Sequence, residues 1–106
     1  MAAWLSRALD RIHAAAHAGN VHLTLKALRE LAALDVDLDE QDLVDMLAAL
    51  TLDDFLARLR SDVTGEWLYA FTPQVAGARM YVKVALRASC IVISFHRQEE
   101  EDDEEE

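Results

Sequence analysis

The feature that most constrains this chain is a change in the spacing of its apolar residues near Gly65. Before that glycine, apolar residues recur every three to four positions, which is the period of an amphipathic helix. After it, apolar and polar residues alternate, which is the period of a strand with one buried face. This order of patterns predicts an α+β fold in which N-terminal helices pack on a C-terminal antiparallel β-sheet.

Three helices are predicted from the first pattern. The first covers residues 2–18 and ends at Gly19, because glycine tolerates the left-handed conformation that closes a helix. The second covers residues 24–34, with Thr24 as its N-cap. The third runs over residues 37–50, where carboxylates precede the apolar positions. The core-facing side of the second helix is predicted to comprise Leu25, Leu28, Leu31 and Ala32.

A short fourth helix is predicted after Thr51. Thr51 and Asp54 have the spacing of a capping box, in which each side chain binds the other residue's backbone N–H. Phe55, Leu56 and Leu59 follow as its apolar anchors.

Three strands are predicted from the second pattern, over residues 67–71, 78–87 and 90–96. Pro73 ends the first, since proline cannot continue a ladder of hydrogen bonds, and Gly77 marks a turn. A one-residue slip would turn a strand's apolar set to the wrong side, so the register of the last two strands follows from their pattern. The predicted core pairs are Leu86 with Ile91, Val84 with Ile93 and Val82 with Phe95. The predicted polar pairs on the other face are Lys83 with Ser94, Tyr81 with His96 and Arg79 with Gln98.

The net charge of −10 is dominated by the eight consecutive acids of residues 99–106. Such a run repels itself and buries no apolar surface, so residues 98–106 are predicted to be a disordered acidic tail beside a single domain of residues 1–97. The one cysteine, Cys90, excludes an internal disulfide framework. No apolar stretch reaches the length of a membrane span, and we expect a cytoplasmic protein without a membrane partner.

The polar face of the last two strands has the residue types needed to cleave RNA without a metal. That reaction needs groups that move protons and cations that stabilise the charge on phosphate. His96 and Tyr81 are candidates for proton transfer, because imidazole exchanges protons near neutral pH. Lys83, Arg79 and Arg87 are candidates for phosphate binding. The alternative is that these side chains only make the exposed face of a half-buried sheet soluble.

Four segments carry a resemblance to a known family: AGNVHLTLKAL at 18–28, LDVDLDEQDLVDMLAALTLDDF at 34–55, the segment from Glu66 to Pro73, and GARMYVKVALRASCIVISFH at 77–96. In this order they resemble the motility quorum-sensing regulator (MqsR) family of toxins. The resemblance implies a RelE-like fold, endoribonuclease cleavage of mRNA and a cognate antitoxin of a type II toxin-antitoxin system. It implies no cofactor and no direct contact with DNA.

The resemblance also implies site residues. Tyr81 and Lys83 match the family's strand. The chain departs from the family pattern at Ala57 and Leu68, where the family has a lysine and a glutamine, and at His96, where it has a lysine. His96 is predicted to replace that last lysine as an acid. Arg58 or Arg60 is predicted to replace the cation that is missing at Ala57. The departures support an alternative function, a degenerate member that acts as a protein-binding or regulatory module.

Three further hypotheses remain open. His13 and His17 are four positions apart, a spacing that can bind a metal, although solvated helix histidines are more common. Trp4 is either a lid on the core or a binding anchor. The acidic tail is either solubilising or an RNA mimic that folds over the basic face.

Overall fold

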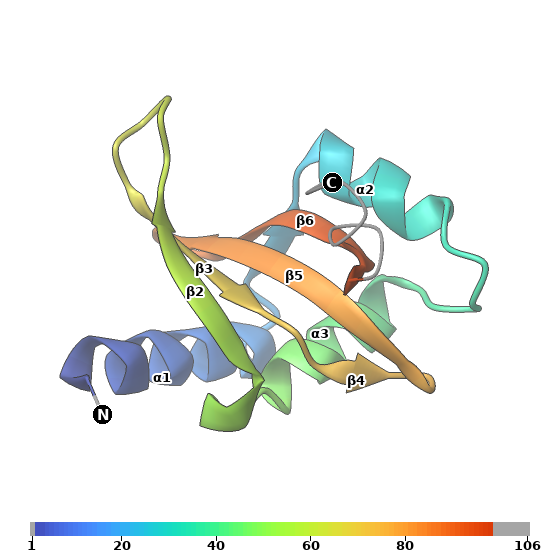
Figure 1. The fold of residues 1–106 in the computed structure, drawn as a ribbon, viewed down its shortest axis with the longest axis horizontal. Helices are drawn as coiled ribbons and strands as arrows, with labels where there is room; N and C mark the ends of the chain where they lie inside the picture. The colour runs from blue at the N-terminus through green and yellow to red at the C-terminus, as the bar shows by residue number, and fades with distance from the viewer. Residues whose placement is uncertain (1, 99–106) are drawn as a thin grey trace.

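The computed structural model describes residues 2–98, and the predictions made for the acidic tail after Gln98 lie outside these residues. The fold is α+β, as predicted (Figure 1). Its elements, in chain order, are α1 (Ala3–His17), β1 (Val21–Leu23), α2 (Leu25–Ala32), α3 (Glu40–Ala48), the 3-10 turn η1 (Leu52–Asp54), β2 (Phe55–Arg60), β3 (Trp67–Phe71), β4 (Gln74–Val75), β5 (Ala78–Leu86) and β6 (Cys90–Arg97).

The sheet has the strand order β1-β6-β5-β3-β2, and β4 pairs with β5 beside this path. All its pairings are antiparallel except that of β1 with β6, which is parallel. The C-terminal strands β2–β6 are therefore antiparallel, as predicted, and β1 from the N-terminal half adds a parallel strand that makes the whole sheet mixed. The sequence pattern missed β1 and β4 because strands of three and two residues are too short to show an alternation.

The three predicted helices form, and their caps follow the sequence. The Thr24 side chain accepts a hydrogen bond from the backbone N–H of Ala27, and Asp39 and Asp42 form a reciprocal capping box at the start of α3. Gly19 adopts the left-handed conformation that ends α1, with φ of 70°. These features depend on neighbouring residues only, which is why the sequence predicts the Thr24 cap and the end of α1 at Gly19, and places carboxylates at the start of α3.

The predicted fourth helix is wrong. Thr51 and Asp54 do form their capping box, but the helix lasts only for the turn η1, and Phe55 enters an extended conformation with ψ of 132°. The chain then forms β2, which pairs along β3. Leu56 and Leu59 are exposed, so their helical spacing does not mark a buried face. Pairing with the next strand, β3, has overridden the local pattern.

The core lies between one face of the sheet and the helices α1 and α3 (Figure 1). Phe71, Val82, Val84 and Phe95 supply its sheet side. Helix α2 lies beside β6 instead, and its predicted apolar side is wrong in part. Ala27 and Leu31 are buried, whereas Leu25 and Leu28 are 61% and 37% exposed, because α2 covers the edge of β6 and only a narrow stripe of it reaches the core.

The register of β5 and β6 is as predicted at one end and shifted at the other. Tyr81 pairs with His96, Val82 with Phe95 and Lys83 with Ser94, as expected. A β-bulge then shifts the ladder by one residue, so that Val84 pairs with Val92 and Leu86 with Cys90. A bulge reverses the facing of the residues beyond it. Cys90 and Val92 therefore lie in the core in place of the predicted Ile91 and Ile93, which are half-buried.

Candidate functional site

The face of the sheet opposite the core brings Tyr81 and His96 together. Their rings are stacked, with centroids 5.0 Å apart and planes inclined by 19°. The alternation along β5 and β6 places both side chains on the side away from α1 and α3. Tyr81 is only 6% exposed, which corrects the expectation of an uncovered phenol, and His96 is half-buried. The pair is therefore held in a fixed arrangement.

A backbone contact assigns the tautomer of His96. Its Nδ1 lies 2.9 Å from the carbonyl oxygen of Arg97, and a carbonyl can only accept a hydrogen bond. Nδ1 therefore carries the proton in the neutral ring, and Nε2 is the basic nitrogen. His96 thus has the chemical form of a group that accepts a proton at Nε2.

Lys83 lies on the same face, opposite Ser94. A second cation, Lys26 of α2, lies there as well, and the sequence pattern did not predict it. Its Nζ donates hydrogen bonds to Ser94 Oγ at 2.7 Å and to Glu30 Oε2 at 3.1 Å. Glu30 in turn accepts the edge N–H of Phe95 at 2.9 Å. These contacts fix α2 to the edge of β6, and they bring a lysine from a segment 68 residues away in the sequence to the site.

Two of the predicted phosphate-binding arginines are bound elsewhere. Arg79 donates a hydrogen bond of 2.6 Å to the carbonyl of Thr72. It pairs with Gln74 of β4, and the β5–β6 ladder ends at Met80 and Arg97 without the predicted pairing of Arg79 with Gln98. The Arg79 guanidinium is thus directed toward the connection between β3 and β4.

Arg87 forms an ion pair with Glu66, with Nη2 2.6 Å from Oε1. The hydrogen bond from Arg87 lowers the pKa of Glu66 below its usual value, and the same bond raises the pKa of Arg87. The positive charge of Arg87 is therefore neutralised within the fold.

The predicted substitutes Arg58 and Arg60 lie on the opposite face from Tyr81. Arg58 pairs with Tyr69, which pairs with the core residue Val84. By the alternation of strands, Arg58 and Arg60 share the face that α1 covers. On the face of Tyr81, the corresponding positions Ala57 and Leu68 leave the β2–β3 side apolar, and Leu68 is buried. The polar groups are thus confined to β5, β6 and α2.

The face with Arg58 carries a stack of aromatic rings and guanidinium groups. The Arg58 guanidinium carbon lies 3.9 Å from the ring centroids of both Trp4 and Trp67, and that of Arg60 lies 4.1 Å from Trp67. Trp4 also packs edge-on against Phe55, with centroids 5.7 Å apart. Trp4 is therefore a lid on this end of the core, and it also fixes an arginine.

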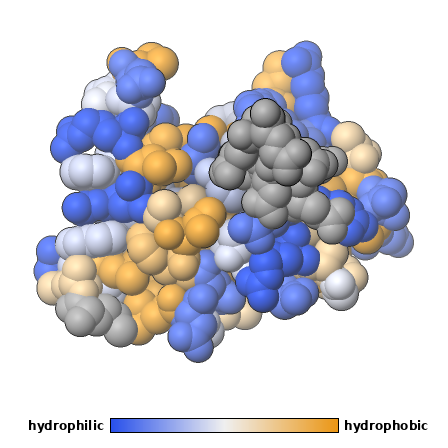
Figure 2. Space-filling view, in the orientation of Figure 1, coloured by the Kyte–Doolittle hydropathy of each residue, from blue (hydrophilic) through white to orange (hydrophobic). Residues whose placement is uncertain are grey.

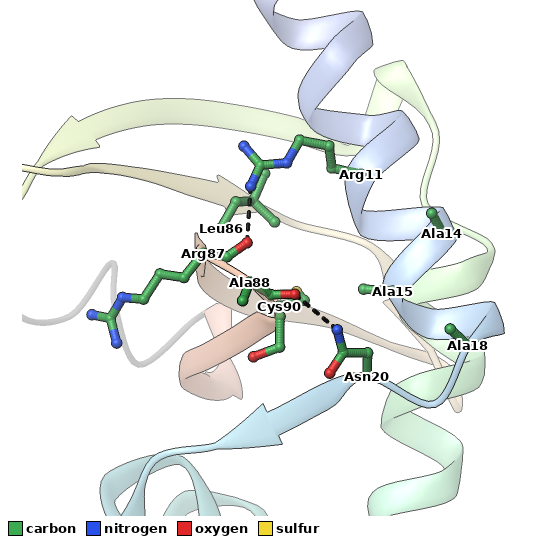
Figure 3. A pocket seen from close by; sticks show the side chains of 10 residues that line it. Arg11, Ala14, Ala15, Ala18, Asn20, Leu86, Arg87, Ala88 and Cys90 are labelled. Carbon is green, nitrogen blue, oxygen red and sulfur yellow. Dashed lines mark hydrogen bonds between the residues drawn. The ribbon is translucent and has the colours of Figure 1, made fainter.

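A hollow of about 270 Å³ lies between α1 and the turn that joins β5 to β6 (Figure 3). Arg11 donates a hydrogen bond of 3.0 Å to the carbonyl of Arg87, and Asn20 donates one of 2.9 Å to the carbonyl of Ala88. Figure 3 shows the Arg87 side chain directed away from Arg11. Alanines form much of its wall, so this hollow gathers no group of reactive side chains.

Two of the remaining candidates for site chemistry, Cys90 and His13, are buried or engaged. Cys90 is buried, and this burial raises the pKa of its thiol to about 12. His13 Nε2 lies 2.8 Å from the carbonyl of Leu50, so this nitrogen carries a proton and is no metal ligand. Within residues 2–98, no group of three or more His, Cys, Asp or Glu side chains could hold a metal ion. In the same part of the chain, no helix is both long and apolar enough to span a membrane.

Comparison with known protein families gives a match. The family model described as "Motility quorum-sensing regulator, toxin of MqsA" matches residues 6–97, which is most of the chain. No curated protein matches the sequence. The matched range includes Tyr81, His96, Lys26 and Lys83, and it begins after Trp4.

Proposed function

We propose a reaction for this protein from the premise that the chain belongs to the motility quorum-sensing regulator family, the toxins of MqsA. Membership makes it the toxin of a toxin-antitoxin pair, with an antitoxin as its partner. The proposed reaction is cleavage of mRNA as a metal-independent endoribonuclease. The observation that carries the proposal is the stack of Tyr81 on His96, flanked by lysines on one face of the sheet.

The proposed chemistry is transfer of the phosphoryl group to the neighbouring 2'-hydroxyl. The 2'-oxygen forms a bond to phosphorus, and the bond from phosphorus to the 5'-oxygen breaks. His96 Nε2 accepts the proton of the 2'-hydroxyl, and the Tyr81 hydroxyl donates a proton to the leaving 5'-oxygen. Solvent then restores the proton of Tyr81 and removes the one on His96. The products are a 2',3'-cyclic phosphate and a free 5'-hydroxyl.

Lys83 and Lys26 are proposed to stabilise the negative charge that grows on the phosphate oxygens. Pairing with Ser94 in the strand ladder positions Lys83, and the hydrogen bond to Ser94 Oγ positions Lys26. Cations that are held in place before the reaction stabilise the transition state more than mobile ones do. Arg79 and Arg87 keep their proposed role in RNA binding only if RNA displaces their present partners, Thr72 and Glu66.

Purified protein incubated with single-stranded RNA in the presence of a metal chelator tests the proposal. We expect cleavage with 2',3'-cyclic phosphate ends, and growth arrest when the protein is expressed without its antitoxin. A Tyr81→Phe, His96→Ala double variant should do neither. Equal arrest by both proteins, or no cleavage by the parent chain, would instead support a toxin-fold protein that acts by binding another protein.

A further inference from the structure

Trp4, Arg58 and Trp67, three members of the stack that ends in Arg60, line a cleft of about 420 Å³ on the helix-covered face, beside the N-terminal half of α1. Figure 2 shows layers of alternately blue and pale side chains on this side of the molecule, between the start of α1 and the β2–β3 hairpin. The cleft is separate from Tyr81 and His96, because the sheet lies between them. The proposed reaction gives it no role.

The charge of the cleft is opposite to that of the chain. Arg7 and Arg11 lie one turn apart on α1 and line it together with Arg58. No carboxylate of residues 2–98 lines it, although the whole chain has a net charge of −10. Three cations without a lining acid form a local positive potential that attracts an anion.

The stack orients Arg58 for anion binding. The indole rings of Trp4 and Trp67 cover its guanidinium plane, with each ring centroid 3.9 Å from the guanidinium carbon. A ligand can therefore approach the group only along its N–H edge. That edge binds two oxygens of a phosphate or carboxylate in parallel. No hydrogen bond joins the Arg58 side chain to another residue of the described part of the chain, so those donors are available to a ligand.

We propose that this cleft is a second RNA contact, which binds the phosphate backbone of the single-stranded substrate away from the bond that is cut. This inference rests on the proposed function, since it concerns the same substrate. RNA is favoured over an acidic peptide because the stack ends in the exposed guanidinium of Arg60, 4.1 Å from the Trp67 ring centroid, and a guanidinium plane is a surface on which an unpaired base stacks. An acidic peptide would use only the charge of the arginines.

The strand order shows how one RNA could reach both places. β2 is the edge strand of the sheet, and it carries Arg58 on the helix-covered face and Ala57 on the face of Tyr81. A single strand that passes around this edge would contact the cleft several nucleotides from the scissile phosphate. Short substrates would not reach the cleft, and long ones would.

Binding of an uncleavable RNA tests this inference without relying on catalysis. The probe is a fluorescein-labelled single strand of about 16 nucleotides with every 2'-hydroxyl methylated. Its affinity is measured by fluorescence anisotropy over a range of salt concentrations. We expect an Arg7→Gln, Arg58→Gln double variant to bind roughly tenfold more weakly, with a salt dependence of log K that is lower by about 1.4, or about 0.7 for each lost phosphate contact.

Two further variants are needed as controls. Arg29→Gln removes the same charge from the exposed side of α2, at the other end of the sheet, and should leave both quantities unchanged. Arg7→Gln alone changes an exposed helix residue, so it keeps the fold even if loss of the stacked Arg58 weakens it. This single variant should lower the salt dependence by about 0.7.

Three results would overturn the inference. Parental affinity and salt dependence in the double variant would show that RNA does not use the cleft. Binding of a poly-glutamate peptide that the variant loses, with RNA binding intact, would assign the cleft to a protein partner. Failure of the parent chain to bind any RNA would remove both proposals. Methylated RNA that binds through the cleft, with no cleavage of ordinary RNA, would support the contact and refute only the proposed reaction.

Discussion

Replacing Tyr81 by phenylalanine isolates the hydroxyl group from the ring. The variant keeps the volume of a side chain that is 94% buried and keeps the ring that stacks on His96 at 5.0 Å. Loss of a hydrogen-bonded hydroxyl costs about 0.5–1.5 kcal/mol of unfolding free energy. A domain of this kind has about 5–15 kcal/mol in total, so the variant remains folded. Tyr81→Ala would be uninformative, because a new cavity costs about 3–5 kcal/mol.

The expected effect of Tyr81→Phe on cleavage is much larger than its effect on stability. A positioned acid contributes about 10²–10⁴ to the rate, which is about 3–5 kcal/mol of transition-state stabilisation. We therefore expect kcat for a short RNA to fall by at least about a hundredfold, with KM nearly unchanged since the lysines proposed to bind phosphate remain. The rate is measured by following cyclic phosphate formation under single-turnover conditions.

Ser89→Ala provides the matched control. It removes a hydroxyl from the turn at the other end of the same strand pair, and its cleavage rate should equal that of the parent. Thermal unfolding of each variant checks that the fold persists. If folded Tyr81→Phe cleaves within about threefold of the parent rate, Tyr81 donates no proton and the proposed division of roles is wrong.

Three other outcomes are expected. Lys26→Met removes the cation bound to Ser94 and should lower the cleavage rate about tenfold, or ~1.4 kcal/mol. Arg29→Met, on the same helix, should leave the rate unchanged. Equal cleavage rates for the parent chain and both variants would contradict the role of Lys26. Thr24→Ala removes the N-cap of α2 and should lower the unfolding free energy by about 1 kcal/mol in urea titration; no change would mean that this cap is replaced by water. The Cys90 thiol, with its pKa raised to about 12 by burial, should react with a thiol reagent at pH 8 only as fast as the protein unfolds, because the thiolate is the reactive form; rapid labelling of folded protein would refute this.

The sequence predicts the parts of the fold that depend on near neighbours. Helix caps at Thr24 and Asp39 form because a side chain binds a backbone N–H within three residues. The pairing of Tyr81 with His96 was also predicted, because matching the apolar positions of the two strands aligns Val82 with Phe95. The turn itself sets a register one residue away, and the bulge after Lys83 restores the predicted one. The stacking of Arg58 could not be predicted, because its two partners, Trp4 and Trp67, lie far apart in the sequence.

Tertiary structure decided the remaining features. The segment 55–60 has the apolar spacing of a helix but forms β2, because β3 offers it a ladder of backbone hydrogen bonds. The bulge after Lys83 turns Cys90 and Val92 into the core, and one extra residue in a strand leaves no mark on composition. Lys26 reaches the site because α2 packs beside β6. The sequence by itself therefore determined the helices α1–α3 and the strands β3, β5 and β6, because their apolar periods are local, whereas β1, β2, β4, the bulge and the residues that meet on each face follow from strand pairing and helix packing.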